Sequence, residues 1–91
     1  MGMGRPATII WTPEHEAKLN EHGVSVEEAN EIIRNNFDRR EPSHSNPHTE
    51  IVDGYTAAGR YLMIAFIDDA EFDVVLGITG YEPTNEIRKR P

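Results

Sequence analysis

The sequence predicts an α+β domain in which two N-terminal helices pack on one face of a curved antiparallel sheet. Two helix-like segments with capping signals come first, and strand-like segments separated by short turns follow them. Helices and strands segregated along a chain in this way favour helices packed on an antiparallel sheet. The expected order is β-α-α-β-β-β-β with a short C-terminal helix. The second face of such a sheet stays open to water or to a ligand.

The bulk composition indicates one small acidic domain. With 91 residues, we expect a flexible arm at residues 1–7 and a single domain over residues 8–91. The absence of cysteine excludes disulfides, thiolate zinc sites and cysteine nucleophiles. The net charge of −7 disfavours bulk attraction to nucleic acid and favours a basic protein partner.

Hydropathy gives no sign of a membrane association. No apolar run approaches the roughly 18 residues that cross a bilayer. The first residues also lack the apolar segment of a signal peptide. We therefore expect a cytoplasmic protein without a membrane partner.

The first strand and helix are read from local signals. Thr8–Trp11 is β-prone and short, which is typical of a strand. Thr12 is a suitable cap for a helix over Pro13–His22, because proline is tolerated at the first helical position. Gly23 then supplies the stop signal.

The second helix has the sharper signal. Ser25 and Glu28 form a capping box, and Val24 with Ala29 forms the hydrophobic staple around it. Apolar residues recur at helical spacing and predict one buried stripe, made of Val26, Ala29, Ile32 and Ile33. The polar pair Asn35-Asn36 marks the expected end of the helix.

The strands follow in sequence. Phe37–Glu41 is expected as a short edge strand, followed by an exposed loop rich in Pro, Ser and Asn. "TEIVDGYT" and "RYLMIAFI" read as strands joined by the turn "AAG", and "FDVVLGITGY" closes the sheet after an acidic turn. Alternation places Phe72, Val74, Leu76 and Ile78 on one face and Val75, Gly77, Thr79 and Tyr81 on the other. Thr84 is the expected cap of a terminal helical turn.

Several kinds of site lack support. His44 and His48 lie four residues apart in the predicted loop, but no metal-binding motif surrounds them, so surface histidines are the favoured interpretation and no metal is expected. A phosphate-binding glycine loop and a G-x-S-x-G motif are both missing. No cofactor is expected.

Arg60 is the most informative basic residue. It opens the central strand after a glycine turn, and on an open face beside Tyr55 and Tyr81 it could bind a phosphate. The alternative is that Arg60 pairs with one of the abundant acidic side chains, and the sequence leaves both interpretations open.

Three segments together resemble a known family. "IIWTPEHEAKLNEHGVSVEEANEII", "DGYTAAGRYLMIAFI" and "ITGYEP" resemble the opening, the glycine turn with its apolar strand, and the closing strand of BrnT-type toxins. The resemblance extends over about Ile9 to Arg90. It implies a RelE-like fold and a toxin that cleaves RNA without metal and is neutralised by a cognate antitoxin protein.

The resemblance also implies roles for individual residues. Arg60 would contact the scissile phosphate, and Tyr55, Tyr81 and His22 would be acid–base or stacking groups. Lys18, Arg39 and Arg40 would contact the RNA. The implied partners are the antitoxin and, if the protein is active, RNA; a homodimer is left open.

The chain departs from the family at positions that matter for catalysis. Glu21 replaces the usual lysine before His22-Gly23, Lys18 occupies a place where the family often has asparagine, and Tyr55 and Tyr81 stand where the family usually has arginines. A neutral phenol donates one hydrogen bond, whereas arginine carries a full charge, so phosphate stabilisation would be weaker. These exchanges support an alternative: a catalytically silent module with the toxin fold that binds a protein partner.

Overall fold

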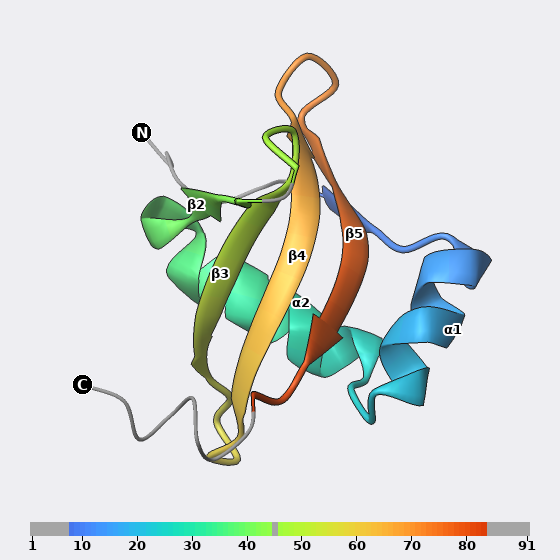
Figure 1. The fold of residues 1–91 in the computed structure, drawn as a ribbon, viewed down its shortest axis with the longest axis vertical. Coiled ribbons are helices and arrows are strands. Elements are labelled where there is room, and N and C mark those ends of the chain that lie inside the picture. Colours follow the sequence, from blue (N-terminus) through green and yellow to red (C-terminus); the bar gives the residue numbers. More distant parts are fainter. Residues whose placement is uncertain (1–7, 45, 84–91) are drawn as a thin grey trace.

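The computed structural model describes residues 8–44 and 46–83 and confirms an α+β architecture (Figure 1). The helices are α1 (Pro13–Glu21) and α2 (Val26–Asn36). The strands are β1 (Thr8–Ile10), β2 (Glu41–Pro42), β3 (Glu50–Tyr55), β4 (Tyr61–Asp69) and β5 (Val74–Tyr81). They form one five-stranded sheet in the order β1-β5-β4-β3-β2.

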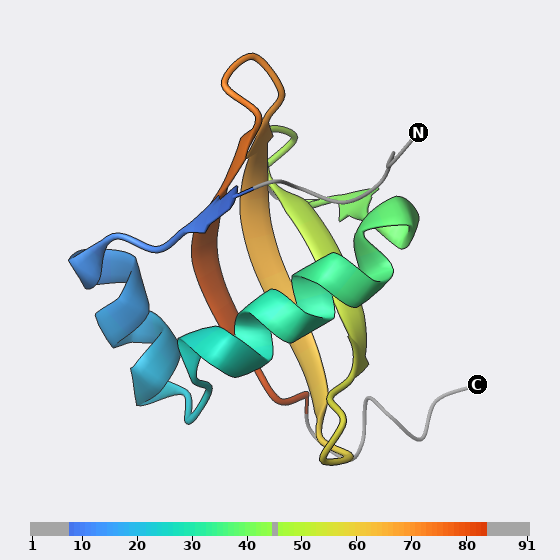
Figure 2. The same ribbon diagram turned by 180° about the vertical axis from the view of Figure 1, so that it is seen from behind.

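Both helices lie on the same face of the sheet. Figure 2 shows α2 crossing in front of the three long strands, with α1 beside it at the β5 side. No described helix or strand covers the opposite face, which we call the open face. Within the described residues, no helix is long and apolar enough to cross a membrane.

The predicted capping signals form in both helices. The Thr12 hydroxyl accepts the backbone N–H of His15 at 3.3 Å and opens α1. Helix α1 ends at Glu21, one residue earlier than expected, and the left-handed φ of 78° at Gly23 turns the chain toward α2. Ser25 and Glu28 make both reciprocal bonds of the capping box, each at 3.1 Å.

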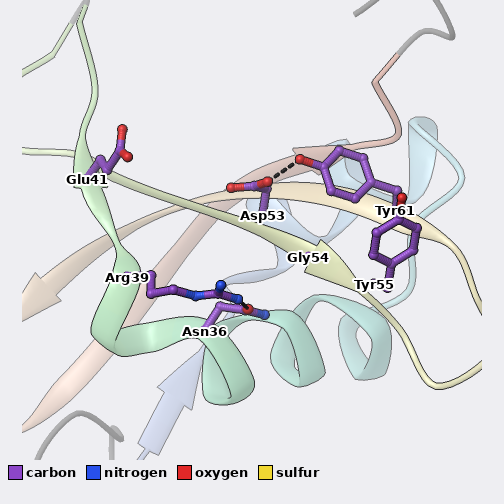
Figure 3. A pocket seen from close by; sticks show the side chains of 7 residues that line it. All are labelled: Asn36, Arg39, Glu41, Asp53, Gly54, Tyr55 and Tyr61. Carbon is purple, nitrogen blue, oxygen red and sulfur yellow. Dashed lines mark hydrogen bonds between the residues drawn. The ribbon is translucent and has the colours of Figure 1, made fainter. Parts of the chain in front are cut away.

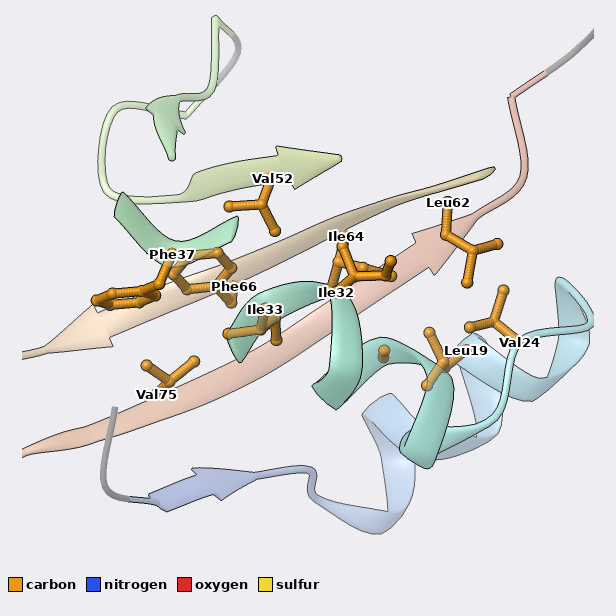
Figure 4. Packing of buried hydrophobic residues seen from close by; sticks show 11 residues of the cluster. Leu19, Val24, Ile32, Ile33, Phe37, Val52, Leu62, Ile64, Phe66 and Val75 are labelled. Carbon is orange, nitrogen blue, oxygen red and sulfur yellow. The ribbon is translucent and has the colours of Figure 1, made fainter. Parts of the chain in front are cut away.

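The core lies between the helices and the sheet. It is formed by Leu19, Val24, Ala29, Ile32, Ile33, Phe37, Val52, Leu62, Ile64, Phe66 and Val75, and Figure 4 shows this cluster. The stripe predicted on α2 is confirmed, with Ala29, Ile32 and Ile33 fully buried and Val26 partly buried. Burial of the stripe fixes α2 across the sheet.

The predicted edge strand at Phe37–Glu41 is wrong in its position. Residues Phe37–Arg39 form a 3₁₀ turn, and strand β2 contains only Glu41–Pro42. The reason is the buried Phe37 ring, which stacks on Phe66 with centroids 5.6 Å apart. This contact holds the chain on the helix side, so pairing with β3 begins only after Arg40.

The sheet is mixed rather than wholly antiparallel. Strand β1 runs parallel to β5, with Thr8 opposite Val74, and the other neighbouring strands are antiparallel. The sequence pattern assigns β1 no neighbour, and in the structure β5 is that neighbour.

Strand β5 contains a bulge that breaks the expected alternation of faces. Gly77 lies opposite Phe66 and Thr79 lies opposite Ala65, so Ile78 is an extra residue. Val75 and Gly77 therefore face the helices, whereas Tyr81, opposite Met63, faces away from them. Placing all four residues Val75, Gly77, Thr79 and Tyr81 on one face was wrong. Phe72 belongs to the turn before β5 and is 69% exposed.

Two expectations fall on the residues outside the described part. The flexible arm at residues 1–7 and the terminal turn capped by Thr84 both lie outside the described residues.

Candidate functional site

Arg60 lies at the end of the β3–β4 hairpin and is held by several acceptors. Its Nη1 donates to both carboxylate oxygens of Glu28 at 2.9 Å and to the carbonyl of Gly23 at 3.1 Å. Its Nη2 contacts Glu82 Oε1 at 3.2 Å. The turn itself is fixed by Thr56, whose N–H donates to the Arg60 carbonyl and whose hydroxyl accepts the Arg60 N–H. The acidic-pair interpretation of Arg60 is the one that the structure shows.

The charges around Arg60 stabilise one another. The backbone N–H of Ser25 is the largest influence on Glu28 and lowers the pKa of that carboxyl, and the Arg60 guanidinium lowers it further. The hydrogen bonds that Arg60 donates to Glu28 and then to Glu82 raise the pKa of Arg60. Both groups are ionised at neutral pH, and the network ties the start of α2 to the hairpin.

Tyr81 and His22 lie next to each other near this network. Their ring centroids are 6.4 Å apart. The Tyr81 hydroxyl donates to the Met63 sulfur at 3.2 Å across the β4–β5 pair, and the Tyr81 side chain is 40% exposed. A phenol and an imidazole at an exposed strand end could exchange protons with a ligand, but among the described residues no carboxylate is hydrogen-bonded to either side chain.

Tyr55 belongs to a second group on the open face. It lies directly opposite Tyr61 in the β3–β4 pair, and the two rings are 4.9 Å apart at an angle of 50°. Tyr61 donates a hydrogen bond to the Asp53 carboxylate. Burial and then this hydrogen bond raise the pKa of Tyr61 to about 12, so the phenol stays protonated and acts as a donor.

Sequence reasoning missed Tyr61 and Asp53. A signal for them was present in the sequence. A hairpin turn between Thr56 and Arg60 places Tyr55 opposite Tyr61. Asp53, two residues before Tyr55, then lies on the same face. Tyr55 itself is 63% exposed. It therefore presents its ring to solvent without filling a core position.

The three basic residues expected to contact RNA do not come together. Lys18 is exposed on α1, on the β5 side of the molecule. Arg39 donates to the Asn36 side chain at the other edge of the sheet. Arg40 stacks 4.2 Å over the Phe37 ring and contacts Asp68 at 3.4 Å and Glu50 at 3.9 Å. No continuous basic surface connects them within the described residues.

A polar pocket of about 380 Å³ lies beside the end of β3 (Figure 3). It is lined by Asn36, Arg39, Glu41, Asp53, Gly54, Tyr55 and Tyr61. Asn36 is 6% exposed and donates to the Ile32 carbonyl at 3.0 Å, so its carboxamide is fixed. Gly54 permits this arrangement because an added Cβ would collide with the Asn36 amide.

The described residues hold no group of three or more His, Asp or Glu side chains that could bind a metal ion. His44 and His48 are both exposed. The candidate chemistry of this chain therefore rests on Arg60, on the paired aromatic residues and on the polar pocket.

Comparisons with known proteins add no further identification. No family model, curated protein or solved structure matches the chain.

Proposed function

We propose that this chain is the toxin-fold component of a two-protein toxin–antitoxin pair and that it acts by binding its protein partner rather than by cleaving RNA. The observation that carries the proposal is the engagement of Arg60. Its guanidinium contacts Glu28, Glu82 and the Gly23 carbonyl. A phosphate would have to displace these carboxylates, and they would repel it.

The open face supports binding to a protein. It carries exposed or half-buried aromatic and apolar side chains on neighbouring strands, among them Tyr55, Tyr61, Met63, Ile67 and Tyr81. Aromatic residues and methionine are enriched at protein interfaces. The net charge of −7 favours a partner with basic surface and disfavours RNA.

The test is co-expression with the product of the adjacent gene, followed by purification of the tagged chain. We expect a stoichiometric complex, and we expect Met63→Asp to weaken it at least tenfold because a charge would enter the centre of the interface. The matched control is Lys18→Asp, an acidic change on α1 away from the open face. Absence of a complex with a folded chain would contradict the proposal.

A metal-independent ribonuclease is the second candidate, and the neighbouring rings of His22 and Tyr81 are the observation that favours it. An imidazole and a phenol are suitable acid–base groups for activating a 2′-hydroxyl. Arg60 would then have to exchange Glu82 for the phosphate, while Glu28 kept its position.

Cleavage of labelled total RNA in EDTA tests this candidate. If the chain is a ribonuclease, Tyr81→Phe should reduce cleavage by about 10²-fold or more, because only a hydroxyl is lost. Arg60→Lys separates charge from geometry, and far-UV circular dichroism of both variants checks the fold. With the binding function we expect no cleavage by the wild type at any protein concentration.

A further inference from the structure

Among the described residues, the second half of strand β3 has a free edge. Strand β2 pairs only with Glu50 and Ile51, because the chain turns away at Arg40. Beyond Ile51, no described strand pairs with the outer side of β3. An unpaired edge is a template for another extended chain, and proteins usually protect such an edge.

The backbone groups on this edge can be assigned from the register. In an antiparallel pair, alternate residues direct their N–H and C=O toward the same neighbour. The N–H of Thr56 donates to the Arg60 carbonyl on the β4 side, whereas the carbonyl of Thr49 accepts from Ser43 on the β2 side. Even-numbered residues of β3 therefore bond β4, and Asp53 and Tyr55 direct their N–H and C=O outward.

The polar pocket lies along these outward groups and has two different walls. Glu41 and Asp53 stand on one side of β3, as Figure 3 shows, and Tyr61 lies with them. Arg39 and Asn36 stand on the other side, where α2 ends. A chain placed at this edge would have side chains of alternate residues against opposite walls.

We propose that the free edge of β3 binds an extended segment of the partner protein as an added antiparallel strand. The segment would continue the line of β2. It would place Lys or Arg residues against Glu41 and Asp53 and small hydroxyl residues against Arg39. This proposal rests on the proposed partner-binding function and names the part of the surface that recognises the partner.

Charge selects this occupant over a second copy of the chain. Two copies paired through this edge would bring the carboxylates of Glu41 and Asp53 of both molecules close together. Like charges at such distances are unfavourable. A basic segment instead matches both the local carboxylates and the net charge of −7.

The experiment uses the full ¹⁵N-labelled chain and a synthetic peptide, acetyl-Lys-Thr-Lys-Thr-Lys-amide. We expect amide exchange at Asp53 and Tyr55 to slow at least tenfold on saturation. Exchange at Val52 and Gly54 should be slow before and after addition, because these amides already bond β4. Such alternation is the signature of an added strand, and contact through the open face would not produce it.

Two N-methylated peptides are the matched probes. In the antiparallel arrangement, the lysines opposite Asp53 and Tyr55 use their N–H groups for pairing, whereas the threonine N–H groups point away from β3. N-methylation of the lysines should weaken binding at least tenfold, and N-methylation of the threonines should change it less than threefold. Equal binding of both peptides, or no binding of the parent peptide, would overturn the proposal.

Two double variants test the acidic side of the pocket, which is formed by Glu41 and Asp53. The double variant Glu41→Gln/Asp53→Asn should weaken the parent peptide at least fivefold. Glu14→Gln/Glu21→Gln on α1 has the same net charge and should change binding less than twofold. Slow exchange at Asp53 and Tyr55 in the free chain that persists on dilution would show that the chain covers its own edge. Slow exchange in the concentrated free chain that becomes fast on dilution would show that a second copy covers it. Either result would reject the partner segment.

Different results would reject the strand-addition proposal and the proposed function. A complex with the adjacent gene product that leaves Asp53 and Tyr55 exchanging fast would reject the edge and keep the function. Peptide binding with the expected alternation, but no complex with that product, would keep the edge and reject the toxin–antitoxin pairing.

Discussion

At the scale of single residues, Glu28 has two structural tasks. Its carboxylate accepts the Ser25 backbone N–H as part of the capping box, and it accepts two contacts from Arg60. The same side chain therefore starts α2 and fixes the β3–β4 hairpin to it. A residue with both tasks leaves Arg60 little freedom to act on a ligand.

Glu28→Gln should destabilise the fold by about 1 kcal/mol at pH 7, because a cap bond and a charge pair are both weakened. Since folding lowers the pKa of Glu28 from its ordinary value of 4.5, its contribution is present above pH 4.5 and is lost as pH falls through the folded pKa. Urea unfolding at pH 7 and at pH 3.5 measures this difference. The variant should lose less stability on acidification than the wild type. Glu27→Gln, at an exposed position one residue earlier on the helix, is the control and should change the stability at pH 7 by less than about 0.5 kcal/mol.

The raised pKa of Tyr61 gives a second prediction. One of the three tyrosines should ionise at about pH 12 in an absorbance titration at alkaline pH. This step should disappear in Tyr61→Phe and remain in Tyr81→Phe, with circular dichroism used to confirm that the chain is folded. Because the folded pKa is raised above 10, this group stabilises the fold below pH 10, and that stability is lost as pH rises toward 12. A titration unaltered by Tyr61→Phe would contradict the assignment.

At the scale of elements, the contact between Trp11 and Gly77 joins the N-terminal part of the chain to the last long strand. A Cβ added at Gly77 would collide with three atoms of the Trp11 indole, and the indole Nε1 donates to Asn30 on α2 at 2.9 Å. The ring is thus fixed between β5 and α2. It cannot move aside without losing a hydrogen bond.

Gly77→Ala should lower the free energy of unfolding by about 1–3 kcal/mol, the usual cost of overpacking. Thermal unfolding would show this as a lower melting temperature. Trp11→Leu removes the colliding ring, so the double variant should lose less than the sum of the two single changes. Additive losses would mean that the ring and the glycine do not interact as described.

The elements that sequence could predict are those with local signals. The caps at Thr12 and Ser25 and the stripe on α2 involve residues within one or two helical turns, so both helices were predicted closely. The position of β2 depends on burial of Phe37 against Phe66, and the bulge at Ile78 depends on its pairing with β4. Such contacts join distant residues, and a local pattern does not contain them.

The residues of the candidate site also differ in whether a local sequence pattern could place them. Tyr55 and Tyr81 could be placed on the open face from strand alternation, although the bulge changes which neighbours share Tyr81's face. The partners of Arg60 come from α2 and from the end of β5, so sequence could only offer a choice between phosphate and acid. Arg39 and Arg40 turn toward Asn36 and Asp68, because the turn at Phe37 redirects the chain.

At the scale of the whole molecule, charge and topology give the chain two unlike sides. The helices cover one face, and the open face carries aromatic side chains beside a free strand edge flanked by carboxylates. The net charge of −7 adds long-range attraction for a basic chain. The proposed partner would therefore approach by charge and be selected by backbone pairing and side-chain fit.

The parallel pairing of β1 with β5 also determines when the fold can be completed. Thr8, in β1, has to meet Val74, which lies 66 residues later in the sequence. During synthesis, the β3–β4 hairpin can form from neighbouring residues, but the first strand has no sheet neighbour until the last one has been made. Contacts between such distant residues slow folding. A nascent chain interrupted before Val74 would leave its first strand unpaired, so only a product that includes β5 can close this sheet.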